Sequence, residues 1–117
     1  MNTDPEIINV NCMDGGCNIK MQLSPDLIWF KGHFPDTPVL PGVVQLDWAI
    51  NMAKTYLNLG DNIKISDLEV LKFKQLILPN QQIELTLQHK STHKFTFSYT
   101  SERGQHSSGR IVFEPVN

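Results

Sequence analysis

The chain has little that would direct it to nucleic acid, into a membrane or out of the cell. Its 117 residues contain no basic tract and no long hydrophobic run, and the formal net charge is only −2. A membrane helix needs about 20 consecutive apolar residues, and a surface that holds nucleic acid or anionic lipid needs clustered Lys and Arg. Residues 1–6 are acidic and lack the positive region of a signal peptide. We therefore expect a cytoplasmic protein with no membrane span and no nucleic-acid partner.

Cysteine is equally scarce. Cys12 and Cys17 flank a turn and can face one another across a hairpin, but a single pair in a chain without export features predicts two free thiols. No further cysteine or nearby histidine completes a set of metal ligands, and no phosphate loop or nucleotide fingerprint is present. We expect no metal and no cofactor, and we expect His89, His93 and His106 to be exposed strand or turn residues.

The length predicts a single domain over residues 1–117. Apolar residues over 7–13 and 17–23 predict two strands around Asp14-Gly15-Gly16, a turn whose glycines can take positive φ. A short apolar segment, 27–30, follows. Prolines at positions 35, 38 and 41 then exclude regular structure until Gly42.

A helix is predicted from Val43 to about Leu59, with Gly60 as its C-terminal cap. Its apolar residues lie almost all the way round, which predicts that it is mostly buried. Four strands are predicted after it, at residues 63–73, 82–89, 94–100 and 107–113. A hairpin, one long helix and several antiparallel strands indicate an α+β fold, with a curved antiparallel sheet wrapped around the central helix.

The chemistry is expected within residues 32–51. His33 and Asp47 stand fourteen positions apart, on either side of a proline-stiffened loop that opens the helix. A histidine titrates near neutrality, with an ordinary pKa of about 6.5. Gly42 has no side chain to obstruct the first amide of the helix, where the helix dipole favours negative charge. The three together suit acid–base chemistry beside a developing oxyanion, although each also has a purely structural role open to it.

Asp47 has apolar neighbours on the predicted helix, among them Val43, Val44 and Ile50. We therefore expect its carboxyl group to be partly desolvated. Burial raises the pKa of an aspartate, which would favour the protonated form that acts as an acid. The alternative is a structural aspartate bonded to the helix backbone.

These residues carry a resemblance. Gly32-His33-Phe34-Pro35, then Pro38-Val39 and Pro41-Gly42-Val43, then an acidic residue fourteen after the histidine, resemble the motif of the hot-dog-fold 3-hydroxyacyl-acyl-carrier-protein dehydratases of fatty acid synthesis. Residues 73–79 are similar to the strand that follows the helix in that family. Within it, the short length and the sequences at 41–48, 96–99 and 107–109 most resemble the small dehydratases of bacterial aryl-polyene pathways.

The resemblance implies a role for each residue of the site. His33 would remove the proton at the α carbon, and Asp47 would hold or protonate the leaving hydroxyl. Phe34, Gly42, Val43 and Asn51 would contact the substrate, with Gly42 facing the thioester oxygen and Asn51 supporting Asp47 from one turn away. Phe34 also stiffens the loop together with Pro35, Pro38 and Pro41. No cofactor is implied.

The resemblance also implies partners. The substrate would be a phosphopantetheine-linked 3-hydroxyacyl chain on acyl-carrier protein. The chain would form a homodimer, or a heteromer with another dehydratase, with His33 of one subunit facing Asp47 of the other across an acyl tunnel. Lys72 and Lys74 alternate with apolar residues on one strand, so both can reach the acidic carrier from one exposed face.

Three functions remain open from the sequence. The first is the dehydration of 3-hydroxyacyl carrier protein to the trans-2-enoyl thioester in fatty acid or aryl-polyene biosynthesis. The second is a hot-dog acyl thioesterase, in which a carboxylate activates water. The third is a catalytically silent subunit of a heteromeric dehydratase. The loop that begins at Gly32 favours the first, because hydrolysis does not need a base over the α carbon.

Overall fold

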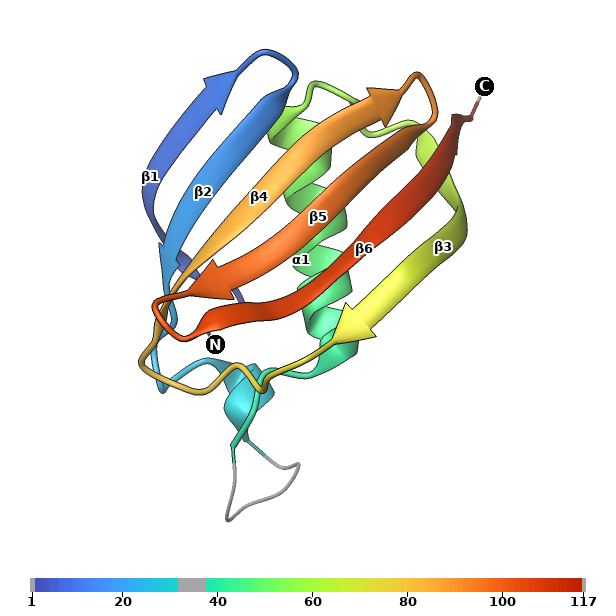
Figure 1. Ribbon diagram of the computed structural model, residues 1–117. Coiled ribbons are helices and arrows are strands. Elements are labelled where there is room, and N and C mark those ends of the chain that lie inside the picture. The colour runs from blue at the N-terminus through green and yellow to red at the C-terminus, as the bar shows by residue number, and fades with distance from the viewer. Residues whose placement is uncertain (1, 32–37, 117) are drawn as a thin grey trace.

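The computed structural model describes residues 2–31 and 38–116. Its strands form one sheet in the order β1-β2-β4-β5-β6-β3, in which every neighbouring pair is antiparallel. The sheet lies across the long helix α1 (Figure 1), which confirms the predicted α+β architecture. The elements are β1 (Glu6–Met13), β2 (Gly16–Gln22), the 3₁₀ turn η1 (Ile28–Phe30), α1 (Gly42–Tyr56), β3 (Ile63–Phe73), β4 (Gln82–Ser91), β5 (Lys94–Ser101) and β6 (Gly104–Pro115).

The first hairpin turns at Asp14 and Gly15, whose φ angles are 51° and 79°. Gly16, predicted to lie in the turn, is the first residue of β2. Cys12 and Cys17 are direct cross-strand partners and form a disulfide with a Cα–Cα distance of 4.0 Å. The prediction of two free thiols is therefore wrong, because a two-residue turn places both side chains on one face of the ribbon, directly opposite each other.

The core lies between α1 and the inward face of the sheet. Side chains alternate between the two faces of a strand, so β4 buries every second residue, and β5 does the same with three aromatic rings. From the strands, the fully buried side chains include Ile83, Leu85, Leu87, Phe95, Phe97 and Tyr99. From the helix, the buried residues are Val44, Gln45, Trp48, Ala49 and Ala53. Each large apolar side chain contributes roughly 1.5–3 kcal/mol by leaving water.

One face of α1 stays in solvent. Val43 is 74% exposed, and Asp47, Asn51 and Thr55 follow it at intervals of four residues and are exposed too. Residues four apart lie on the same face of a helix, and the single sheet covers only the other faces. The prediction of a helix buried almost all the way round is therefore wrong for this face.

The helix ends at Tyr56, three residues before the predicted end. Asn58 takes a left-handed conformation with φ 57° and turns the chain away from the helix axis. The amide of Gly60, at φ 77°, then donates to the carbonyl of Lys54 at 3.3 Å. The C-cap residue is therefore Leu57 and not the predicted Gly60, although the Gly60 amide still bonds a carbonyl of the last turn. Within residues 2–31 and 38–116, no helix has the length and apolarity needed to cross a membrane.

Strands β1 and β3 are the two edges of the sheet. β3 has the predicted bounds and contains a bulge between Glu69 and Lys72, where Val70 takes φ 53°. This edge also carries four apolar side chains that are 37–57% exposed: Leu68, Val70, Leu71 and Phe73. An apolar, unpaired edge is a surface on which a further strand can pair.

Candidate active site

The site is built around the start of α1. Gly42 is the first helical residue, and Pro41 precedes it without a side-chain cap. Within the described ranges, no acceptor is bonded to the amide of Gly42 or Val43. The helix dipole adds partial positive charge at these amides, so they can bind an anionic oxygen. A Cβ at position 42 would lie 3.0 Å from Cε1 of Phe73, so glycine also permits the close approach of β3.

Asp47 lies one turn further along the exposed face of α1. The Nδ2 of Asn51 donates to its Oδ2 at 3.2 Å, so the geometry expected of Asn51 as a support is present. Asp47 itself is exposed, and its expected desolvation is wrong for the single chain. Of its apolar neighbours, Val43 points into solvent and Val44 into the core, so neither covers the carboxylate.

His33, Phe34 and Pro35 lie outside the described residues, so the position of the predicted base remains a prediction. Hydrogen bonds hold the chain on both sides of this segment. Before it, the amide of Ile28 donates to Asn2 at 2.9 Å, and the indole of Trp29 donates to Thr3 at 2.7 Å. After it, the amide of Leu40 donates to the carbonyl of Ile77 at 2.8 Å.

A buried polar cluster under the start of α1 was missed from the sequence. Gln45 is 4% exposed; its Nε2 donates to the carbonyl of Leu40 at 3.1 Å, and its Oε1 accepts from the Ser107 hydroxyl at 2.7 Å. Its backbone carbonyl accepts from the Tyr99 hydroxyl at 2.7 Å. The available signal was a glutamine placed three and four residues before Trp48 and Ala49, at core positions of the helix.

Burial, and secondarily the negative charge of Asp47, raises the pKa of the Tyr99 hydroxyl well above its ordinary value. The hydroxyl therefore keeps its proton throughout the physiological pH range. Because it stays protonated, it remains a donor to the carbonyl of Gln45.

The histidines other than His33 differ in their exposure and in their partners. His93 is exposed, as predicted, and His89 is partly buried against the carbonyl of Leu57. His106 is wholly buried, so its expected exposure is wrong. Its Nε2 lies 2.6 Å from the Ser101 hydroxyl and its Nδ1 lies 3.1 Å from the carbonyl of Leu76, and these partners compensate for its burial. No cluster of three metal-ligating side chains occurs in the described part of the chain.

A hollow of about 260 Å³ opens beside the exposed face of α1. Asn51, which bonds Asp47, is one of the residues that line this hollow. The other lining residues are Asp4, Pro5, Ile7, Trp48, Met52, Thr55 and Tyr56. A larger hollow of about 580 Å³ lies between the ends of β4 and β5 and includes none of the predicted site residues.

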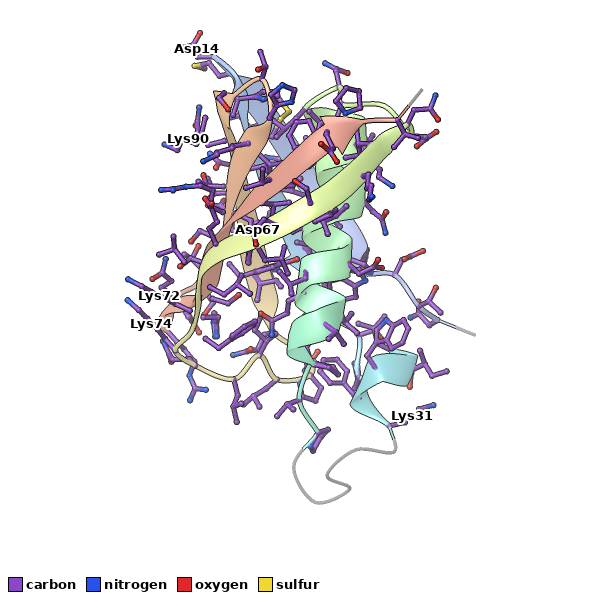
Figure 2. All side chains as sticks on the ribbon, turned by 90° about the vertical axis from the view of Figure 1, so that its right-hand side faces the viewer. Asp14, Lys31, Asp67, Lys72, Lys74 and Lys90 are labelled. Carbon is purple, nitrogen blue, oxygen red and sulfur yellow. A yellow bond between two sulfur atoms is a disulfide. The ribbon has the colours of Figure 1, made fainter. Side chains whose placement is uncertain are left out.

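Lys72 and Lys74 are exposed and extend to the same side of the molecule (Figure 2). Lys31 lies on the other side in that view. The arrangement agrees with the predicted single basic face for Lys72 and Lys74.

The model of the ApeI-like family, described as ApeI dehydratase, matches residues 10–110. The chain belongs to this family. The match confirms the resemblance to hot-dog dehydratases, and the narrower placement among small dehydratases of the aryl-polyene type agrees with it.

Solved structures support the same family. A chain of the dehydratase heterocomplex ApeI:P from Xenorhabdus doucetiae is 33% identical with a TM-score of 0.86, and the match covers 95% of this chain and 98% of that one. An uncharacterized protein from Erwinia carotovora is 35% identical with a TM-score of 0.82, over 97% and 98% of the two chains. The fold of this ApeI-like chain is the hot-dog fold.

A relative among characterised enzymes is the 3-hydroxyacyl-[acyl-carrier-protein] dehydratase FabZ of Haemophilus influenzae. It is 37% identical over 65 residues, which are 50% of this chain and 44% of the relative. A second H. influenzae strain gives 34% identity over 77 residues and 52% of the relative. The chain thus spans about half the length of the FabZ dehydratases it matches.

Proposed function

We propose that this ApeI-like chain removes water from 3-hydroxyacyl thioesters on acyl-carrier protein and releases the trans-2-enoyl thioester. The observation that carries the proposal is the start of α1, where uncapped amides lie one turn before Asp47. A carboxyl group and an oxyanion site at this separation suit a substrate whose hydroxyl is two carbons from its carbonyl. The family membership supports the same reaction.

In the proposed reaction, His33 takes the proton from the α carbon, and the C–H electrons form the new double bond. Negative charge develops on the thioester oxygen, where the amide of Gly42 stabilises it. Asp47 holds the β-hydroxyl and supplies a proton as the C–O bond breaks, so that water leaves. Asn51 orients the carboxyl group, and Val43 and Phe34 contact the acyl chain. The elimination neither oxidises nor reduces the substrate, so it requires no cofactor.

Two chains complete the proposed site. Four apolar side chains are exposed on two surfaces: Val43 on α1, and Leu68, Val70 and Phe73 on the edge strand β3. Apolar surface gathered in this way is typical of a protein–protein interface. A second copy would cover both surfaces and bring its His33 to Asp47. The relative from X. doucetiae is described as a heterocomplex, so a related dehydratase is the alternative partner.

The acyl-carrier protein is proposed to dock at Lys72 and Lys74 in the cytoplasm, where such carriers act. Replacing both lysines by glutamate would raise KM about tenfold for a carrier-bound substrate and leave a small N-acetylcysteamine thioester unaffected, since only the carrier brings acidic residues. Lys64→Glu, at the other end of β3, is the matched control. Equal KM changes for both substrates would contradict this docking site.

The reaction is tested by mass spectrometry of a synthetic 3-hydroxyacyl thioester on carrier protein, incubated with the wild type or with His33→Ala. Aliphatic and aryl chains are compared. Loss of water with the wild type alone supports the proposal and the role of His33. Release of free acid would indicate a thioesterase, and no turnover of either chain type would indicate a silent or heteromeric subunit.

A further inference from the structure

Gln45 connects three parts of the protein that meet under the start of α1. Its side chain bonds Leu40 on one side and Ser107 of β6 on the other, and its backbone carbonyl accepts from Tyr99 of β5. Ser107 and Tyr99 are wholly buried, and Gln45 is 4% exposed. Every buried side-chain polar atom in the described part of the chain has a partner.

The connection acts on the residues just before the proposed oxyanion site. The carbonyl of Leu40 is held by Gln45 and its amide by Ile77, so this residue is fixed from both directions. The amide of Gln45 also donates to the carbonyl of Pro41 at 3.1 Å. Leu40 and Pro41 together lead directly into Gly42. The direction in which the chain enters α1 is thus held by Gln45 together with the carbonyl of Ile77.

Packing alone does not require glutamine at this position. An apolar side chain of similar size would fill the same volume without the cost of burying an amide. A buried polar group that satisfies all its hydrogen bonds instead holds its partners in one geometry. The partner that Gln45 alone orients is the carbonyl of Leu40, two residues before Gly42.

We propose that Gln45 is a positioning residue for the dehydration, which holds Leu40 and Pro41 so that the amide of Gly42 faces the oxygen on which negative charge develops. This inference rests on the proposed function. Gln45 does not touch the substrate; it acts through the backbone of residues 40–42.

The kinetic test uses Gln45→Met, which retains the size of the side chain and removes both of its hydrogen bonds. An interaction that strengthens only in the transition state affects kcat and not KM. We expect kcat to fall by about tenfold, less than the roughly 10²–10³-fold that follows removal of an oxyanion donor, because the Gly42 amide is displaced and not removed; KM should stay within about twofold. Ser107→Ala leaves the Leu40 bond in place and should lower kcat by only about threefold. Leu46→Met, in the same turn, is the matched control.

A spectroscopic readout separates positioning from a merely structural role. The crotonyl thioester of N-acetylcysteamine, labelled with ¹³C at its carbonyl, is bound to each folded variant and examined by isotope-edited infrared spectroscopy. Hydrogen bonding from Gly42 lowers the carbonyl stretching frequency in the wild type and in Leu46→Met. Gln45→Met should lose most of this shift although its thermal unfolding remains cooperative.

A folded Gln45→Met protein with wild-type kcat and wild-type carbonyl frequency would overturn the inference. If this variant does not fold, Gln45→Leu, which likewise has no donor for the carbonyl of Leu40, replaces it under the same criteria. A wild type that removes no water overturns the proposed function itself, whereas an active wild type with an unaffected Gln45 variant overturns only the positioning role.

Discussion

The face of α1 that packs on the sheet carries Val44, Gln45 and Trp48, whereas the face in solvent carries Val43, Asp47 and Asn51. On the buried face, both side-chain polar atoms of Gln45 are hydrogen-bonded and the apolar side chains are enclosed. On the solvent face, a valine that is 74% exposed stands one turn before a carboxylate. Folding of the single chain accounts for the first arrangement but not for the second.

The contrast teaches where to look for chemistry in a small domain. Apart from Gln45, the residues that are covered within the chain serve folding, and their loss is measured as stability. Residues that serve the proposed reaction lie where a second chain and a substrate would cover them, and their loss is measured as rate. If the two faces are divided in this way, substitutions should separate the two measurements.

The largest expected effect is that of Asp47→Asn. We expect the rate of water loss to fall by about 10²–10⁴-fold, because the amide cannot supply the proton. The free energy of unfolding should change by less than about 0.5 kcal/mol, since the side chain is exposed. Urea denaturation and turnover of the carrier-bound substrate give the two values, with Thr55→Ala on the same face as the control. A large loss of stability would contradict the division between faces.

Disruption of the edge strand tests whether the solvent face needs a second chain. Leu68→Lys combined with Val70→Lys places two charges on the edge of β3, and we expect a folded monomer without activity although His33 and Asp47 are intact. Sedimentation velocity and turnover are measured on the same sample. Ile8→Lys, at a residue that is 45% exposed on the other edge β1, should change neither. An active monomer would show that one chain holds the whole site.

Trp48→Ala should lower the stability of the protein and leave its rate nearly unchanged. Truncation of this side chain, which is 4% exposed, is expected to cost about 3–5 kcal/mol of unfolding free energy because a large cavity forms in the core. The fraction that stays folded should retain a kcat within about threefold of the wild type. Chemical denaturation followed by circular dichroism measures the loss. A change in the free energy of unfolding below about 1 kcal/mol would mean that the buried face of α1 contributes less to stability than its enclosure suggests.

The smallest effect is expected from Asn51→Ala. The variant loses one exposed hydrogen bond to Asp47, so kcat should fall by about fivefold, equivalent to about 1 kcal/mol. Stability should again stay within about 0.5 kcal/mol of the wild type. Steady-state kinetics measures the rate, and Asn51→Gln, with a longer amide, tests whether the bond can be restored. A rate below that of Asp47→Asn would show that Asn51 has a role of its own.

Much of the fold followed from local patterns. The bounds of β3 were predicted to the residue, and the other strands to within a few residues, because alternation of apolar side chains and turn residues are visible in sequence. The position of the helix was predicted correctly, but the exposure of one of its faces was not predicted. Periodicity reveals which residues are apolar, and it does not reveal how many sides the rest of the chain covers.

The site was predicted less completely. The motif located Gly42, Asp47 and Asn51 on one helix start, but the burial of Asp47 depended on neighbours whose side chains point elsewhere. His106 was expected in solvent because its bonds to Ser101 and Leu76 come from distant or backbone groups. Gln45 was missed for the same reason, since its partners come from a loop and two strands.

The disulfide between Cys12 and Cys17 lies at the end of the molecule where α1 finishes, with the Cys17 sulfur 3.3 Å from the carbonyl of Tyr56. The helix starts at the opposite end, close to the proposed site (Figure 1). In mechanical terms, the described part of the chain has a disulfide cross-link at one end and only non-covalent interactions between its segments at the other. Small displacements therefore meet less covalent resistance at the end of the molecule that holds the proposed site.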